Sequence, residues 1–383
     1  MSPPASSASR LMRMPQSLPD EAPKSGGGKT GAIRVMLVDD SLTVRTIFRR
    51  MVESDGAMEV AATASSAERA ISQLKTMPVD VILLDLEMPG MGGLEALPSI
   101  LATAPDAQVL VVSSLTEDGA EATVAALSQG AADTMLKPRP GGFNEDYRSQ
   151  LLGKIRALGS DADQAETAAP QASAPTQQRR SPQPEVVAIG ASTGGIHALN
   201  LMLRTLTADF DLPILITQHL PASFIPVFAR QIEVASGRTT VIAEDGTEIR
   251  RGEIAIATGH GHMILRRIGE RLVVRNSSEP AGSGCLPSVD PMLTSAANAC
   301  EGRVLAIILS GMGRDGFVGA QQLVEAGGTV WAQNPETSAV WGMPGAVAKA
   351  GLTSHVASPE ALGAKLMSLY ARGVSAETAR AAT

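Results

Sequence analysis

Apolar residues recur along the first third of the chain in short β-branched runs, each followed by a segment with helical spacing of apolar positions. The runs predict five strands, at residues 33–38, 58–63, 79–84, 108–113 and 133–136. Strands that alternate with helical segments are typical of βαβ units, in which the strands lie parallel. The pattern therefore predicts a doubly wound α/β domain with a five-stranded parallel sheet.

The same alternation returns in the second half of the chain. Predicted strands begin at residue 186 and cover 212–218, 303–310 and 329–332, with shorter strands between 239 and 274. This pattern indicates a second α/β domain with a mostly parallel sheet.

Two stretches interrupt the alternation. Residues 1–31 are rich in Ser, Pro and Gly without periodicity, and residues 159–184 contain no aliphatic residue larger than Ala. Such segments cannot bury enough apolar surface to offset chain entropy, so we expect a disordered tail and a flexible linker. The predicted organisation is then a tail at 1–31, an α/β domain at 32–158, a linker at 159–184, a second α/β domain at 185–372 and a tail at 373–383.

Composition excludes several classes of protein. A hydrophobic fraction of 44% in 383 residues supports two globular cores, and a net charge of −7 gives no basic footprint for nucleic acid. No apolar run approaches the roughly 20 residues of a membrane span, and no signal peptide is recognised. The two cysteines, Cys285 and Cys300, make neither a disulfide framework nor a metal cluster. We expect a cytoplasmic monomer without nucleic-acid binding or membrane insertion.

Acidic residues gather at the predicted strand ends of the first domain. Asp39 and Asp40 follow the first strand, and Asp85 follows the third. Ligands of such sheets bind beyond the carboxyl ends of the strands. Three carboxylates there would repel one another, and bound Mg²⁺ would relieve this and shield a phosphoryl group arriving at a nucleophilic Asp85. Ser113 and Lys137, after the fourth and fifth strands, offer a hydroxyl and an ammonium group to phosphoryl oxygens.

These five positions in this order resemble the receiver domain of two-component response regulators. The resemblance implies that Asp85 accepts phosphate from a histidine kinase, with Mg²⁺ held by Asp39, Asp40, Asp85 and the carbonyl of Glu87. Receivers often place an aromatic switch residue three positions before the lysine, but Thr134 occupies that position here. Inward rotation of a ring is therefore not the expected signal.

A glycine-rich bend follows the first predicted strand of the second domain. The segment 190–194, Gly-Ala-Ser-Thr-Gly, fits the pattern G-x-S-x-G. Small flanking residues allow a sharp turn from strand to helix that exposes the Ser192 hydroxyl beside helix-start N–H groups, as an acyl-transfer nucleophile requires. A turn that cradles a phosphate, or that only packs the strand against the helix, fits the stretch equally well.

Two further residues follow strong apolar strands of the same domain. His219 comes directly after strand 212–218, and Asp315 lies in the glycine-rich turn after strand 303–310. A nucleophile, a base and a carboxylate that orients the base are the parts of a hydrolytic triad. The chain order Ser, His, Asp differs from the Ser, acid, His order of α/β-hydrolases, so that fold is not implied. Less well placed alternatives are His197, His260, His262 and His355 for the base, and Asp245 and Asp290 for the acid.

Five motifs together resemble the chemotaxis protein-glutamate methylesterase family over residues 32–370. They lie at residues 190–195, 218–221, 287–290, 310–316 and 332–344. The resemblance implies hydrolysis of γ-glutamyl methyl esters on the cytoplasmic helices of chemoreceptors, with release of methanol, and deamidation of receptor glutamines. It further implies a receiver that covers the active site as a lid, with some action as a tether.

The resemblance assigns roles to particular residues. Ser192 would be the nucleophile, His219 the base and Asp315 its partner, with backbone N–H groups at Thr193 and Met312 facing the oxyanion. The esterase step would need no cofactor, so Mg²⁺ would belong to the receiver alone. One departure is a leucine at position 286, where the family has arginine.

Two other classes of function compete with this interpretation. Receivers commonly precede DNA-binding domains, but no basic recognition helix follows the linker. A nucleotide-binding module could use residues 190–195 as a phosphate loop, but this segment lacks the lysine of a P-loop.

Overall fold

The computed structural model describes residues 31–113, 116–138, 142–160 and 183–381. Residues 31–383 form one compact unit. Residues 1–30 of the predicted tail at 1–31 and residues 161–182 of the predicted linker at 159–184 lie outside the described residues, so these two predictions stay open. Helix α11 (Pro359–Ala381) continues past residue 372, where the sequence suggested a C-terminal tail.

The first α/β segment contains the five parallel strands that the sequence predicts. Their order in the sheet is β2-β1-β3-β4-β5. The strands are β1 (Ile33–Val38), β2 (Met58–Ala64), β3 (Val81–Asp85), β4 (Gln108–Ser113) and β5 (Asp133–Leu136). The helices between and after them are α1 (Leu42–Glu53), α2 (Ala67–Leu74), α3 (Gly93–Thr103), α4 (Glu117–Gln129) and α5 (Glu145–Gly159). The predicted doubly wound fold is confirmed.

Local sequence explains why these elements form where they do. Strand β3 is buried along its whole length, as expected for a central strand covered on both faces by helices. Helices α1, α2, α4 and α5 each begin after a polar residue whose side chain accepts a hydrogen bond from a first-turn N–H group. These residues are Ser41, Ser66, Thr116 and Asn144. Such caps satisfy backbone donors that have no partner within the helix.

A seven-stranded parallel sheet forms the second α/β segment, in the order β15-β14-β13-β6-β7-β10-β8. Its strands are β6 (Val186–Ala191), β7 (Ile214–Gln218), β8 (Thr240–Ile242), β10 (Ile254–Ile256), β13 (Val304–Ile308), β14 (Thr329–Gln333) and β15 (His355–Ala357). Its helices, besides α11, are α6 (Gly195–Leu203), α7 (Ile225–Ser236), α8 (Val289–Ala299), α9 (Phe317–Glu325) and α10 (Met343–Lys349), with 3-10 turns η1 (Ala222–Phe224) and η2 (Pro335–Thr337). The predicted mostly parallel sheet is confirmed.

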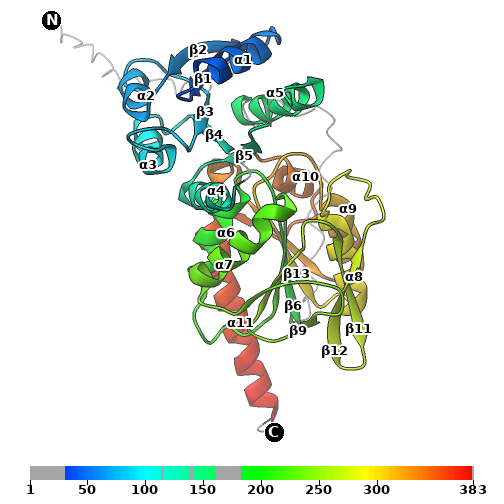
Figure 1. Ribbon diagram of the computed structural model, residues 1–383. Coiled ribbons are helices and arrows are strands. Elements are labelled where there is room, and N and C mark those ends of the chain that lie inside the picture. Colours follow the sequence, from blue (N-terminus) through cyan, green and yellow to red (C-terminus); the bar gives the residue numbers. More distant parts are fainter. Residues whose placement is uncertain (1–30, 114–115, 139–141, 161–182, 382–383) are drawn as a thin grey trace, which may run out of the picture. The chain divides into compact units, whose positions relative to one another are not determined.

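Alternate side chains of this sheet enter two different cores. On β6, Val187 and Ile189 pack with residues of α6, α7 and α11, whereas Val186 and Ala188 pack with residues of α8 and α9. Figure 1 shows these two groups of helices on opposite sides of the strands. The period of two along a buried strand therefore builds a three-layer α/β/α arrangement.

A small antiparallel sheet accompanies the large one. Its order is β11-β12-β9, with β9 (Glu248–Ile249), β11 (His262–Ile268) and β12 (Arg271–Ser277). The sequence indicated only short strands in this region. Strands β11 and β12 form a hairpin around Gly269, whose positive φ of 60° suits glycine in a tight turn.

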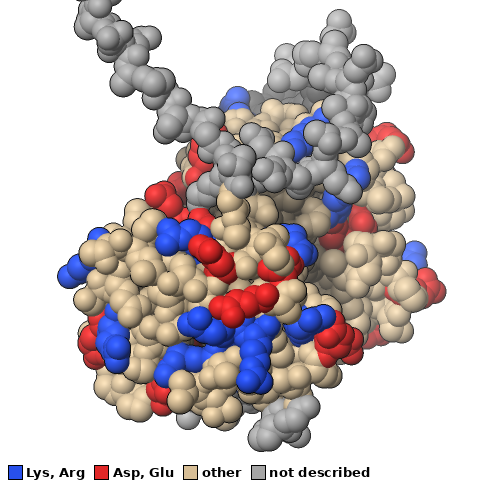
Figure 2. All heavy atoms as spheres, turned by 90° about the horizontal axis from the view of Figure 1, so that it is seen from above, with Lys and Arg blue, Asp and Glu red and all other residues tan. Residues whose placement is uncertain are grey.

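Charged side chains of both signs share the surface. In Figure 2, one face carries a group of Lys and Arg side chains bordered by Asp and Glu. Ion pairs such as Arg230–Glu121 and Arg275–Asp245 link the two signs elsewhere. No helix in the described part of the chain is both long enough and apolar enough to span a membrane.

Candidate functional site

The serine bend lies at the carboxyl end of β6, between neighbouring strands β13 and β7. Gly194 has a φ of +77°, and a Cβ there would approach Ala339 Cβ to 2.6 Å. A Cβ on Gly195 would approach Ala191 Cβ equally closely, at 2.6 Å. Glycine is thus required for the sharp entry into α6, which leaves Ser192 half-buried at the bend.

His219 and Asp315 meet at the same edge of the sheet. His219 follows β7, and its backbone N–H donates to the Ala191 carbonyl at 3.0 Å. Its ring Nε2 lies 2.7 Å from Asp315 Oδ2 in the loop after β13. The ring therefore keeps Nδ1 as the nitrogen for a second partner.

Ser192 and His219 line one pocket together with Gln218, Gly194 and Leu220. Within the described side chains, Ser192 Oγ makes no hydrogen bond to the His219 ring. Catalytic hydrogen bonds of this kind often tighten only when substrate binds. The structure thus brings the three predicted residues to one edge and joins two of them directly.

Asp315 is held by a dense set of donors. Asp315 is only 2% exposed. Ser288 Oγ donates to Oδ1 at 2.6 Å, and the Val289 N–H donates to Oδ2 at 2.7 Å. Ser288 is the N-cap of α8, so the carboxylate also lies at the positive end of a helix. This arrangement fixes both the position and the charge of Asp315.

The pKa values of the pair move in opposite directions. Burial alone would raise the pKa of Asp315, but hydrogen bonds from His219, Ser288 and Val289 lower it to about 2. Burial alone would lower the pKa of His219, but hydrogen bonds to Asp315 and Cys285 and the charges of these groups raise it to about 9. A permanently ionised carboxylate is what orients an imidazole and stabilises its protonated form.

The rival acids have other partners. Asp290 Oδ1 accepts from the Gly319 N–H at 2.8 Å, which ties α8 to α9. Asp245 is paired with Arg275 at 2.7 Å. Neither of the two is hydrogen-bonded to His219 in the described structure.

Two of the alternative histidines are hydrogen-bonded to groups other than Asp315. His197 Nδ1 lies 2.9 Å from the Ser128 carbonyl. His262 is 2% exposed, and its ring binds the Ser288 N–H and the Glu279 carbonyl, at 2.9 and 2.8 Å. His262 therefore positions the very serine that holds Asp315. Of the remaining two, His260 lies near the start of β11 and His355 begins β15.

Two backbone N–H groups near Ser192 are free to face an oxyanion. Among the described residues, the amides of Thr193 and Met312 donate to no other group. Gly311, beside Met312, approaches Ser192 so closely that a Cβ would lie 2.8 Å from Ser192 Cβ. The Met312 loop is thus in contact with the predicted nucleophile.

The sequence-based prediction does not include some residues that support the site. Gln218 Nε2 donates to the Ser192 carbonyl at 3.0 Å. Ser310 Oγ donates to the Thr193 carbonyl at 2.7 Å, and the Ser310 N–H donates to Gln333 Oε1 at 2.8 Å. A buried polar residue at a strand end is the general signal that could have pointed to Gln218 and Ser310.

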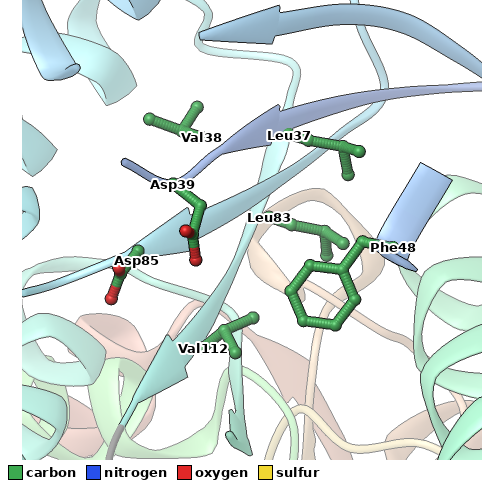
Figure 3. A pocket seen from close by; sticks show the side chains of 7 residues that line it. All are labelled: Leu37, Val38, Asp39, Phe48, Leu83, Asp85 and Val112. Atoms are coloured by element: carbon green, nitrogen blue, oxygen red, sulfur yellow. The ribbon is translucent and has the colours of Figure 1, made fainter. Parts of the chain in front are cut away.

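A second cluster lies at the carboxyl ends of β1 and β3. One carboxylate oxygen from each of Asp39, Asp40 and Asp85 lies within 4.8 Å of the others. Figure 3 shows the Asp39 and Asp85 carboxylates beside the apolar side chains of Leu83, Phe48 and Val112. An all-oxygen set of this kind suits Mg²⁺.

Lys137 closes this second cluster. Its Nζ lies 2.6 Å from Asp85 Oδ2 and 3.1 Å from Asp39 Oδ2. Burial raises the pKa of Asp85 to about 6, against the opposing effect of Lys137. The Glu87 N–H donates to Asp85 Oδ1 at 3.1 Å. Ser113 is fully buried, and its hydroxyl has no hydrogen-bond partner in the described part of the chain.

Thr134 occupies the position at which receivers often have an aromatic switch residue. Thr134 is buried, and its Oγ1 has no hydrogen-bond partner among the described residues. Leu286 is 52% exposed in the loop ahead of α8.

Comparison with known proteins decides the family. Residues 35–142 match the response regulator receiver domain, and residues 187–366 match the CheB methylesterase family. The chain is 41% identical over 371 residues to protein-glutamate methylesterase/protein-glutamine glutaminase 1 of Paramagnetospirillum magneticum, covering 90% of this chain and 97% of the relative. The chain belongs to this methylesterase family.

A second relative agrees with this assignment, and one solved structure is also similar to part of the chain. Protein-glutamate methylesterase/protein-glutamine glutaminase 2 of Caulobacter vibrioides is 44% identical over 339 residues, which cover 86% of this chain and 97% of the relative. The solved catalytic domain of the Thermotoga maritima CheB methylesterase is 34% identical, with a TM-score of 0.48, and covers 49% of this chain and 99% of that chain. The predicted family and its enzyme class, a protein-glutamate methylesterase and glutaminase with a receiver domain, are confirmed.

Proposed function

We propose that this methylesterase acts through Ser192 as nucleophile, His219 as base and Asp315 as the carboxylate that orients the base. The observation that carries the proposal is the 2.7 Å contact between His219 Nε2 and Asp315 Oδ2, at strand ends on either side of the Ser192 bend. The fixed charge of Asp315 supports the imidazolium that forms during the reaction.

The proposed reaction uses groups that the chain itself supplies. His219 accepts the Ser192 proton while Oγ attacks the ester carbonyl, and the N–H groups of Thr193 and Met312 donate to the resulting oxyanion. Methoxide leaves with the proton of His219 as methanol. Water then attacks the acyl carbonyl while giving a proton to His219, and the bond to Oγ breaks as His219 returns this proton to Ser192. Attack on a glutamine side chain would release ammonia by the same steps.

The substrates that we propose are γ-glutamyl methyl esters, and also glutamines, on chemoreceptors. The support is the family assignment together with a serine that lies half-buried in a pocket. Since these ester groups lie on the cytoplasmic helices of receptors, we infer that the enzyme works in the cytoplasm. The site requires a substrate side chain long enough to reach Ser192.

Methanol release from methylated receptor membranes tests this function. Wild-type protein should release methanol, and Ser192→Ala should lose nearly all of this activity, since loss of a triad nucleophile costs several orders of magnitude. Combining Ser192→Ala with His219→Ala should cost little more, because the residues act as a unit. A Ser192→Ala rate above about a tenth of wild type would contradict the nucleophile assignment.

For the receiver segment, we propose that a histidine kinase phosphorylates Asp85. Asp39, Asp40, Asp85 and the Glu87 carbonyl would hold Mg²⁺, which when bound offsets the negative charge of the phosphoryl group. The clustered carboxylates and the unpartnered Ser113 hydroxyl support this assignment. Ser113 and Lys137 would then bind phosphoryl oxygens.

We also propose that the receiver segment restrains the esterase as a lid. The contacts that support this involve the residue next to the nucleophile: Thr193 Oγ1 donates to Asp133 Oδ2 at 2.6 Å, and the Gly194 N–H donates to the Ala132 carbonyl at 2.5 Å. On helix α4, Ser128 Oγ accepts from Asn200 Nδ2 at 2.8 Å. A phosphoryl group on Asp85 would draw Ser113 and Lys137 toward it and alter the neighbouring β5 edge.

A fragment that begins at residue 185 distinguishes lid from tether. On a soluble receptor fragment, it should work faster than the unphosphorylated full chain, and Mg²⁺ with a phosphodonor should raise the full chain toward the same rate. Equal rates for the fragment and the unphosphorylated chain would leave only the tether.

A further inference from the structure

The loop between β12 and α8 brings a thiol to the methylesterase site. Cys285 lies in this loop and is half-buried. One ligand atom from each of Cys285, His219 and Asp315 lies within 4.8 Å of the other two. The sequence gives no hint of this cluster, since the three residues come from separate loops.

Several contacts hold the thiol near this position. The Cys285 N–H donates to Ser283 Oγ at 3.3 Å, and Ser283 Oγ donates to Ser288 Oγ at 3.2 Å. Ser288 in turn holds Asp315 at 2.6 Å. The Cys285 Sγ itself donates to the Ser283 carbonyl at 3.9 Å, so the Cys285 loop and the Asp315 carboxylate are parts of one hydrogen-bonded structure.

The donor atoms select the kind of ion. A sulfur, an imidazole nitrogen and a carboxylate oxygen suit Zn²⁺ and similar borderline-soft cations, whereas the all-oxygen set of Asp39, Asp40 and Asp85 suits Mg²⁺. Tetrahedral Zn²⁺ with ligands at about 2.0–2.3 Å needs donor atoms roughly 3.3–3.7 Å apart. The three donor atoms lie within 4.8 Å of one another, and His219 Nε2 and Asp315 Oδ2, 2.7 Å apart, must separate by about 0.6 Å to reach this spacing.

We propose that Cys285, His219 and Asp315 form a binding site for Zn²⁺ or a cation of similar softness, and that its occupation switches off the esterase. A His219 nitrogen that binds the ion keeps no lone pair for the Ser192 proton. An Asp315 carboxylate that binds the ion no longer orients the imidazole. Binding requires the thiolate and releases the thiol proton to solvent.

Absorption of bound Co²⁺, a spectroscopic substitute for Zn²⁺, tests the site directly in the full-length protein. Thiolate coordination should give a strong sulfur-to-cobalt charge-transfer band in wild type. The matched control Cys300→Ala, which removes the buried second cysteine, should keep the band, and Cys285→Ala should lose it. The receiver carboxylates offer no sulfur and cannot produce this signal. A wild type without the band, or a Cys285→Ala protein that keeps it, would overturn the proposal.

Methanol release under buffered free Zn²⁺ tests the functional consequence. Each variant is compared with its own metal-free rate. Zn²⁺ should inhibit wild type reversibly, with recovery after chelation. The concentration for half-inhibition should rise at least about tenfold in Cys285→Ala, because loss of even an outer-shell partner of a metal ligand lowers affinity by roughly ten- to a hundredfold. Equal inhibition of both proteins would count against the proposal.

Two further variants keep the tests independent. Ser192→Ala should retain the cobalt band although it is inactive, so the metal site is judged separately from the nucleophile assignment. Cys285→Ser, which keeps the size of the side chain, replaces Cys285→Ala in both tests if the alanine protein fails to fold. The serine variant should also lose the band, and a retained band would again overturn the proposal.

Discussion

Asp85 and Asp315 occupy equivalent positions in two parallel sheets, yet their electrostatics are opposite. Each lies at or just beyond the carboxyl end of a buried strand, and each is 2% exposed. The pKa of Asp85 is raised to about 6, whereas the pKa of Asp315 is lowered to about 2. Burial alone therefore does not determine the charge of a buried carboxyl group.

The difference comes from the fixed donors around each carboxylate. Asp315 accepts hydrogen bonds from Ser288, the Val289 N–H and His219, all within 2.7 Å. Burial raises the pKa of Asp85, and the pairing with Lys137 only partly offsets this, while the neighbouring Asp39 carboxylate adds a smaller unfavourable effect on a second negative charge. The protein thus stabilises the ionised form of Asp315, whereas the ionised form of Asp85 remains disfavoured.

The two environments suit two kinds of chemistry. A carboxylate that only orients an imidazole must stay ionised and immobile, and fixed donors achieve this. A carboxylate that exchanges a phosphoryl group must tolerate a change of charge, and a site that recruits a cation meets that need.

The largest effect expected from this comparison is at Asp315. Asp315→Asn should keep the fold but lower kcat by roughly three to four orders of magnitude, because the amide neither fixes the imidazole nor balances its charge. Asp245→Asn is the matched control, since Asp245 is hydrogen-bonded to Arg275 instead of His219. Methanol release and circular dichroism are measured for both. Similar losses in the two variants would show that the loss is not specific to the carboxylate beside His219.

On the other side of the comparison, Asp85→Asn should abolish phosphate incorporation from a kinase or a small phosphodonor. The amide removes the nucleophilic oxygen while keeping the size of the side chain. Asp106→Asn, a change at an exposed carboxylate, should label like wild type. Substitution of Asp39 or Asp40 should weaken the Mg²⁺ dependence of labelling. Undiminished labelling of Asp85→Asn would place the phosphate elsewhere.

The positions of the two aspartates could be predicted from local sequence. Strand ends were predictable because buried parallel strands are short apolar runs, and the residues after them lie at one edge of the sheet. The positions of Asp85, His219 and Asp315 follow from that rule alone.

The donors that distinguish the two aspartates could not be predicted in this way. Ser288 and His262 reach Asp315 through contacts between residues 26 and 27 positions apart in the chain. No periodicity records such a contact, because it depends on how the hairpin β11–β12 and helix α8 pack. The same holds for Cys285, which the sequence offers only as one of two isolated cysteines.

The pH dependence of the esterase should reveal the carboxylate of Asp315. An imidazolium cannot accept the Ser192 proton, so kcat/KM should rise with pH through the pKa of His219, which the Asp315 pairing raises above the ordinary 6.5. In Asp315→Asn the residual activity should rise at lower pH, because the charge that stabilises the imidazolium is gone. Asp245→Asn, which removes a carboxylate paired with Arg275, should keep the wild-type profile. An unmoved profile in Asp315→Asn would mean that another group titrates.

The smallest expected effect concerns one of the contacts that link the two segments beside the nucleophile. Thr193→Val removes the hydroxyl that binds Asp133 but keeps the backbone N–H assigned to the oxyanion. A hydrogen bond to a charged group contributes about 1.5–3 kcal/mol, and each 1.4 kcal/mol is about tenfold in an equilibrium. If the closed state dominates, the unphosphorylated Thr193→Val protein should therefore hydrolyse a soluble receptor fragment at least about tenfold faster than wild type. Lys154→Met is the matched control, since it removes another partner of Asp133, at 2.6 Å, and keeps the Thr193 hydroxyl, so it should not reproduce this gain. In a fragment that begins at residue 185, Thr193→Val should change nothing, because Asp133 is absent. An equal gain in full chain and fragment would trace the effect to the active site and remove this hydrogen bond from the lid.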